Sequence, residues 1–143
     1  MSTKARTFEG AVVVITGGAG DIGCALGMRF VAAGAKVVLL DRDADRLAEA
    51  AARLEAVAAG AEVMSLTCDV TQPAACDAAM ARVCDSWGGV DVLVNNAGVS
   101  HRSRLCDTDI AVLRKVIEVN LFGAIHCTQA ALASIRRRGG SIV

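Results

Sequence analysis

The feature that most constrains the fold is an apolar run that ends in a cluster of glycines. Residues 11–16 read Ala-Val-Val-Val-Ile-Thr, a continuous and mostly β-branched stretch typical of a strand that is buried on both faces. The segment that follows, Gly18–Gly23, fits the pattern G-x-G-x-x-G at the point where a strand gives way to a helix. We therefore expect a parallel sheet whose first strand leads into a phosphate-binding turn.

The rest of the chain alternates helical stretches with short apolar stretches. We predict helices over residues 22–33, 43–59, 73–87 and 107–138, and further strands over residues 36–40, 62–67, 90–94 and 141–143. Parallel strands that are joined by helices require right-handed crossovers. The fold class is therefore predicted to be α/β, a doubly wound parallel sheet (Rossmann fold) with strand order 3-2-1-4 and a stub of a fifth strand.

Length and composition limit the organisation and the partners. The 143 residues, 54% hydrophobic and 21% charged, suit one domain over residues 1–143. The 15 basic and 15 acidic residues balance, so no long-range field favours nucleic acid or an anionic membrane. The N-terminal residues 1–10 are polar, and no apolar run approaches the ~20 residues of a membrane span. We expect a cytoplasmic protein.

The six cysteines do not form a metal-binding pattern. No Cys-x-x-Cys pair occurs, and neither histidine stands at metal-ligand spacing from a cysteine. The sequence therefore predicts no metal site. Most of the thiols fall in apolar periodic segments, where a free cysteine behaves as a small buried hydrophobe. The positions concerned are Cys24, Cys68, Cys76, Cys84, Cys106 and Cys127.

The glycine-rich turn and the end of the second predicted strand indicate a dinucleotide. The helix N-terminus after the turn presents free N–H groups to a pyrophosphate, although glycines also punctuate ordinary turns. Asp41 follows Gly23 by eighteen residues, where a carboxylate can accept hydrogen bonds from a ribose diol and repel a 2′-phosphate. NAD is therefore favoured over NADP. Arg42 leaves NADP open, because its guanidinium can pair with that phosphate.

Motifs farther along the chain resemble those of a known family. Asp69-Val70 follows the third predicted strand, Asn95-Asn96-Ala97-Gly98 the fourth, and Asn120 lies in the next helix. Together with Thr16-Gly17 and Gly23, their order and spacing resemble the short-chain dehydrogenase/reductase family from Phe8 to Val143. The tetrapeptide Asn-Asn-Ala-Gly is the most specific of these elements.

The resemblance implies a role for each matching residue. Asp41 would hold the adenosine ribose, Asp69 with Val70 would flank the adenine, and Ala97 with Gly98 would lie beneath the ribose and nicotinamide. Asn95 would mainly stabilise the central strand. The glycine pattern and the resemblance together assign cofactor binding to Gly17, Gly18, Gly20, Asp21, Ile22, Gly23, Asp41, Arg42, Asp69, Val70, Asn96, Ala97 and Gly98.

Two residues carry alternative interpretations. Asn120 matches the asparagine that, in the family, helps to organise a proton relay, so it is the one catalytic candidate; alternatively it satisfies a backbone group inside its helix. Asp21 stands where family members carry glycine or alanine. Its carboxylate could cap the helix N-terminus, or it could repel the pyrophosphate.

The resemblance also implies a catalytic Ser after the fifth strand, then a Tyr and, four residues later, a Lys. The chain contains no tyrosine and ends at Val143. We therefore expect the N-terminal part of such an enzyme, incomplete at its C-terminus and inactive alone. Two hypotheses remain: the binding part of an NAD(P)-dependent oxidoreductase, whose alcohol or ketone substrate is bound only by a full-length parent, or a catalytically inactive nucleotide-binding or interaction module. The predicted helix 107–138 is a candidate surface for homo-oligomers.

Overall fold

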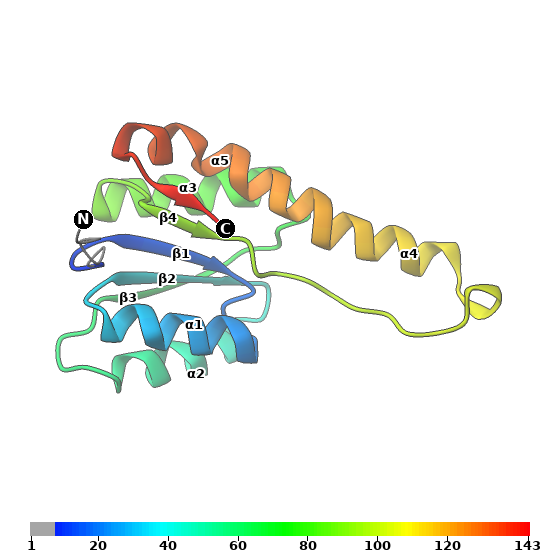
Figure 1. The fold of residues 1–143 in the computed structure, drawn as a ribbon, viewed down its shortest axis with the longest axis horizontal. Coiled ribbons are helices and arrows are strands. Elements are labelled where there is room, and N and C mark those ends of the chain that lie inside the picture. The colour runs from blue at the N-terminus through cyan, green and yellow to red at the C-terminus, as the bar shows by residue number, and fades with distance from the viewer. Residues whose placement is uncertain (1–7) are drawn as a thin grey trace, which may run out of the picture.

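The computed structural model describes residues 8–143 and contains a five-stranded parallel sheet (Figure 1). The strands lie in the order β3-β2-β1-β4-β5, and every neighbouring pair is parallel. This confirms the predicted order, with β5 at the edge. Residues 1–7, most of the polar N-terminal segment, lie outside the described residues. The strands are β1 (Val12–Thr16), β2 (Lys36–Asp41), β3 (Val63–Thr67), β4 (Val92–Val94) and β5 (Ser141–Ile142).

Helices cover both faces of the sheet, as the doubly wound topology requires. In Figure 1, α1 (Asp21–Ala32) and α2 (Ala44–Glu55) lie on one face, and α3 (Pro73–Trp87) and α5 (Gly123–Arg138) lie on the other. The helix α4 (Ile110–Ile117) continues the line of α5 beyond the sheet. Among the described helices, none has the length and hydropathy needed to cross a membrane.

The central strands divide their side chains between two apolar layers. Val12 and Val14 pack in the layer beneath α3 and α5, whereas Val13 and Ile15 pack in the layer beneath α1 and α2. The same alternation runs along β2, because successive side chains of a strand point to opposite faces. All of these side chains are at most 1% exposed, and burial of each contributes about 1.5–3 kcal/mol. The apolar runs that predicted buried strands thus form the core.

The long helix predicted over residues 107–138 differs from the observed segment. A separate 3₁₀ turn spans Leu105–Asp107, and α4 begins at Ile110. The start is displaced because Asp109 is the N-cap, its carboxylate accepting a hydrogen bond of 2.8 Å from the amide of Ala111. A π-helical turn, Glu118–Phe122, then joins α4 to α5. The second helix is also shorter than predicted, since α2 ends four residues before residue 59.

A carboxylate at the start of β4 ties three elements together. One oxygen of Asp91, Oδ2, accepts a hydrogen bond of 2.8 Å from the backbone amide of Val12 in β1. Both oxygens also accept from the guanidinium of Arg138 at the end of α5, at 2.7 and 2.8 Å. The hydrogen bonds from Arg138 hold the pKa of the Asp91 carboxyl below its usual value. This carboxylate therefore stabilises the folded state when it is charged.

Replacing Asp91 by asparagine should lower stability in a pH-dependent way. The side-chain oxygen of the asparagine still accepts from the backbone amide of Val12, but the charge-assisted bonds to Arg138 are lost. We therefore expect the free energy of unfolding at pH 7 to fall by roughly 1–2 kcal/mol. Because the folded-state pKa is depressed, this contribution is complete above the unfolded value of about 4 and is lost as the pH falls through the folded value. Urea denaturation at several pH values measures it. A difference between the two proteins that stayed constant below pH ~4 would contradict the assignment.

Candidate functional site

The glycine-rich turn leaves β1 and enters α1 with very little space around it. Gly17 has a φ of 63°, the left-handed region, and a Cβ on it would lie 2.8 Å from the Cα of Ala97. A Cβ on Gly23 would collide with the carbonyl oxygen of Gly17, and one on Gly18 would lie 2.8 Å from the Cβ of Leu39. The glycines therefore let the backbone of the turn pack closely, so that the N-terminus of α1 faces the carboxyl end of the sheet.

The prediction that Asp21 could cap α1 is wrong. Gly20 is the N-cap, and no side chain caps this helix. Asp21 is instead the first helical residue and is exposed, beside a cavity at the end of the sheet. A carboxylate in the first turn is favourable toward the helix dipole, but it also places a negative charge where an anion would approach. The repulsion that the sequence suggested therefore stays a prediction.

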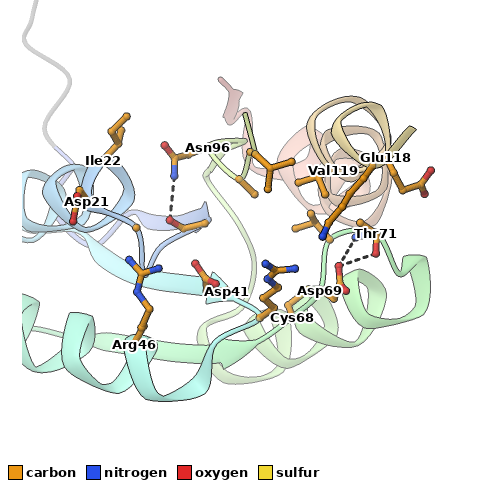
Figure 2. A pocket seen from close by; sticks show the side chains of 18 of the residues that line it. Asp21, Ile22, Asp41, Arg46, Cys68, Asp69, Thr71, Asn96, Glu118 and Val119 are labelled. Carbon is orange, nitrogen blue, oxygen red and sulfur yellow. Dashed lines mark hydrogen bonds between the residues drawn. The ribbon is translucent and has the colours of Figure 1, made fainter. Parts of the chain in front are cut away.

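The ends of β1 and β4 are joined by two polar side chains. The hydroxyl of Thr16, a residue only 2% exposed, accepts hydrogen bonds from the amides of Asn96 (3.0 Å) and Ala97 (2.9 Å) and donates to the carbonyl of Val94 (3.4 Å). In return, the side-chain amide of Asn96 donates to the carbonyl of Thr16 (3.0 Å) and to that of Gly17 (3.1 Å), and Figure 2 draws the second of these bonds. Asn96 thus holds the glycine-rich turn as well as lining the cavity.

The carboxylate at the end of β2 is oriented by backbone amides. Asp41 Oδ2 accepts from the amide of Ala19 (3.2 Å), and Oδ1 accepts from the amide of Asp43 (3.3 Å). Each oxygen retains capacity for a further hydrogen bond. Two cations, Arg42 and Arg46, line the same cavity, and Figure 2 shows Arg46 beside Asp41. The carboxylate is therefore placed to receive hydroxyl groups of a ligand, with positive charge nearby.

The turn after β3 forms the opposite wall. Asp69 Oδ1 accepts from the amide (2.9 Å) and the hydroxyl (2.8 Å) of Thr71, and these bonds hold the pKa of the carboxyl below its usual value. Val70 is 7% exposed, and its carbonyl oxygen lies 2.9 Å from Nδ1 of His126. This contact places the imidazole of His126 against the turn. The wall thus pairs an apolar side chain with a charged one.

Burial makes the cysteine at this wall a poor nucleophile. Burial raises the pKa of Cys68 to about 12, with the neighbouring thiol of Cys76 adding to the shift. Burial also raises the pKa of Cys127, whose Sγ lies 3.6 Å from Sγ of Cys76. Cys24 is buried as well, whereas Cys84 is partly buried and Cys106 is exposed. The expectation of buried thiols thus holds for four of the six cysteines.

These groups surround one cavity of about 900 Å³ at the carboxyl ends of the strands. Its amide-rich turn, its carboxylate at Asp41 and its half-apolar far wall fit an elongated anionic ligand such as a dinucleotide. Within residues 8–143, no group of side chains has the arrangement of a metal site. Gly18 and Gly23 pack behind the turn, and the predicted residues that line the cavity are Gly17, Gly20, Asp21, Ile22, Asp41, Arg42, Asp69, Val70, Asn96, Ala97 and Gly98.

Comparison with known proteins agrees with this geometry. The family described as short chain dehydrogenase matches residues 11–143. The chain belongs to this family. It is 40% identical to the mouse (Mus musculus) dehydrogenase/reductase SDR family member 7B over 139 residues, which are 95% of this chain and 43% of that protein. The chain therefore spans less than half the length of this curated relative.

Two similar solved structures contain different nicotinamide cofactors. An NAD⁺-bound xylitol dehydrogenase superposes with a TM-score of 0.90 at 30% identity, over 96% of this chain and 53% of that one. The L-sorbose reductase of Gluconobacter frateurii, complexed with NADPH and L-sorbose, superposes with a TM-score of 0.87 at 34% identity. This second likeness covers 94% of the present chain and 51% of the reductase.

Asn120, the family's candidate catalytic residue, lies outside the lining of the cavity. Its Oδ1 accepts from the amide of Val99 (2.8 Å), and its Nδ2 donates to the carbonyl of Val99 (2.9 Å). These bonds fasten the loop after β4 to the π-helical turn. Asn120 therefore does satisfy backbone groups, as the alternative interpretation predicted. These groups belong to Val99 in the loop and not to the helix of Asn120. A part in proton transfer stays a prediction.

Several residues that line the cavity were missed by sequence reasoning. Arg46 lies in the first turn of α2, five residues after Asp41. Residues 114 and 115 of α4 repeat at a spacing of four as residues 118 and 119 of the π-helical turn: Arg114, Lys115, Glu118 and Val119. That spacing was a usable signal, because it puts the four residues on one face of the helix. No signal distinguished the remaining lining residues, which are Cys68, Thr71 and Val99.

Replacing Thr16 by valine should loosen the joint between β1 and β4. Valine keeps the shape but leaves the amide of Ala97 without its acceptor, and it leaves the amide of Asn96 with the carbonyl of Val94 alone. We therefore expect a loss of about 1–3 kcal/mol in the free energy of unfolding. Thr16→Ser is the matched control, because it keeps the hydroxyl and removes one methyl group, at a cost of about 1 kcal/mol. Urea denaturation compares the variants. Equal stability of the valine and serine variants would refute the role of the hydroxyl.

Proposed function

We propose that this chain is the dinucleotide-binding part of an NAD(P)-dependent oxidoreductase that transfers hydride between a nicotinamide and an alcohol or ketone. The observation that carries the proposal is the joint between the glycine-rich turn and Asn96-Ala97-Gly98, which faces Asp41 across one cavity. This arrangement stands beside the first strand, where the strand order reverses and where ligands of open α/β sheets bind. Residues 1–143 form one nucleotide-binding domain in this proposal.

Each part of the cavity suits one part of the cofactor. The turn at the N-terminus of α1 would receive the pyrophosphate, and Asp41 would accept from the adenosine ribose. The wall of Asp69 and Val70 would flank the adenine, while Ala97 and Gly98 would lie beneath the nicotinamide ribose. The bound nicotinamide would supply the hydride chemistry, and the chain would supply binding and orientation.

NAD is the proposed cofactor in preference to NADP. The Asp41 carboxylate is held toward the cavity by two amides, so a 2′-phosphate would meet a fixed negative charge. Arg42 and Arg46 reduce this repulsion, because both line the cavity. The NAD⁺-bound xylitol dehydrogenase and the NADPH-bound sorbose reductase are both similar to this chain, so the preference depends on Asp41 rather than on likeness.

Removing the carboxylate tests this preference. We expect the wild-type chain to bind NAD more tightly than NADP, and Asp41→Ala to narrow the difference by about tenfold, because it removes both the ribose acceptor and the charge. Isothermal titration with each dinucleotide measures the two affinities. Tighter binding of NADP by the wild-type chain would refute the Asp41 argument, and absence of binding by both would refute the proposed function.

As a 143-residue polypeptide, the chain should bind dinucleotide without turning it over. It contains no tyrosine, so a phenol cannot donate or accept the substrate proton, and general acid/base groups typically contribute ~10²–10⁴-fold. We expect no alcohol-dependent reduction of NAD above background in absorbance assays. Robust activity that persisted through independent purifications would show that other residues catalyse proton transfer, with Asn120 the first to be tested.

We propose self-association as a second role of residues 107–138. This role corresponds to the alternative hypothesis of an interaction module, and an exposed apolar stripe favours it. Large apolar side chains recur along α4, the π-helical turn and α5, all at least 39% exposed: Ile110, Ile117, Leu121, Ile125 and Leu132. Their spacing places them along one side of the continuous helical segment. A second copy presents the same stripe, so two copies can pair in a self-complementary way.

A further inference from the structure

The glycine-rich turn and the connection between β2 and α2 are joined in a closed ring of four hydrogen bonds. The amide of Ala19 donates to Asp41 Oδ2 (3.2 Å), and Asp41 Oδ1 accepts from the amide of Asp43 (3.3 Å). Asp43 Oδ1 accepts from the amide of Arg46 (3.0 Å). Arg46 Nη2 then closes the ring by donating to the carbonyl of Ala19 (3.3 Å). Both peptide groups of Ala19 are thus held from outside the turn.

The turn needs external bonds because its own sequence favours mobility. Ala19 stands between Gly18 and Gly20, and glycine loses more conformational freedom on ordering than any other residue. Inside the turn, the amide of Gly20 donates to the carbonyl of Gly17 (3.1 Å). The amide of Cys24 in α1 donates to the carbonyl of Gly20 (2.8 Å), and the remaining bonds to the backbone of the turn come from β2, from Asn96 and from Arg46. Arg46 is the partner that reaches the turn from α2.

The side chain of Arg46 is well placed for this task. Its backbone amide lies in the first turn of α2 and is fixed by donating to the N-cap carboxylate of Asp43. Figure 2 shows the side chain rising from α2 toward the turn that carries Asp21. Throughout residues 8–143, no carboxylate forms an ion pair with Arg46. The guanidinium is therefore committed to the carbonyl of Ala19 rather than to a salt bridge.

We propose that Arg46 is a positioning residue for the dinucleotide: its bond to Ala19 holds the glycine-rich turn in the conformation that receives the pyrophosphate. This inference rests on the proposed function of the cavity. It assigns Arg46 an effect on the turn before any ligand arrives. A guanidinium that only contacted a bound phosphate would have no such effect, so the two roles can be separated in the unliganded protein.

Hydrogen exchange and titration together test the proposal on three variants. Arg46→Met removes the donor and the charge, whereas Arg46→Lys keeps the charge and one donor that can reach the carbonyl. Arg53→Met is the matched control, since it removes an exposed charge from the same helix. Amide exchange is followed in two peptides. Residues 16–23 report on the glycine-rich turn, and residues 90–96, which contain β4, serve as the comparison. Isothermal titration uses ADP-ribose, which carries the pyrophosphate without the nicotinamide.

We expect Arg46→Met to accelerate exchange in residues 16–23 alone and to weaken ADP-ribose binding about three- to tenfold, the range for loss of one hydrogen bond. Arg46→Lys should restore most of both properties, and Arg53→Met should change neither. If Arg46→Met accelerates exchange throughout the chain, the lysine variant decides between the two explanations. Exchange in residues 16–23 of Arg46→Lys at the wild-type rate supports the proposal. Exchange there as fast as in Arg46→Met overturns it.

Two further outcomes would overturn the inference and leave the proposed function intact. Weaker binding with unchanged exchange in residues 16–23 would mean that Arg46 contacts the ligand directly. Unchanged binding in Arg46→Met would mean that the turn holds its shape without it. Failure of the wild-type chain to bind ADP-ribose would overturn the proposed function itself, and this inference with it.

Discussion

One buried hydroxyl connects the two strands between which the cavity opens. The chain leaves β1 toward β2 on one side, while β4 lies on the other, so the connections diverge at the end of β1 and leave a crevice there. Thr16 bridges this divergence, because its hydroxyl accepts hydrogen bonds from two amides of the segment after β4. Asn96 returns the interaction by binding the carbonyls that begin the turn. The position of the turn relative to Ala97 and Gly98 therefore follows from this exchange of hydrogen bonds.

The order and type of the regular elements could be predicted from local patterns. Apolar β-branched runs marked the strands, glycines marked the ends of helices, and the handedness of crossovers left one sheet order. The ends of elements were less predictable where a side chain competes with the backbone, as Asp109 does when it caps α4. The π-helical turn could not be predicted, because Asn120 bonds there to Val99, a contact between segments that periodicity does not describe.

The candidate site was predictable where its residues form short motifs and unpredictable where they come from helix faces. Asp41, Asp69 and the Asn-Asn-Ala-Gly segment each end a strand, and the ends of parallel strands meet at one edge. Arg46 and Lys115 reach the same edge from helices whose angle to the sheet the sequence does not specify. Asp21 shows the reverse error, since its residue type suits a cap but Gly20 occupies the capping position. The motifs thus predicted where the site residues lie better than they predicted which hydrogen bonds their side chains form.

The distribution of charge around the cavity indicates how an anion can bind in a chain with no net charge. Asp21 and Asp41 oppose an approaching pyrophosphate, while Arg42 and Arg46 attract it, and these opposed charges largely offset one another at the rim. Asp21, Arg42 and Arg46 are exposed, so salt and water weaken their fields over about 10 Å. The amides at the N-terminus of α1 act at hydrogen-bond distance and are held in place by the surrounding backbone, so they are weakened far less. Binding of the pyrophosphate should therefore depend mainly on the shape of the turn and only weakly on the local sum of charges. For this binding, the hydrogen bonds that Asp41 and Arg46 make to Ala19 should matter more than the charges of these two residues.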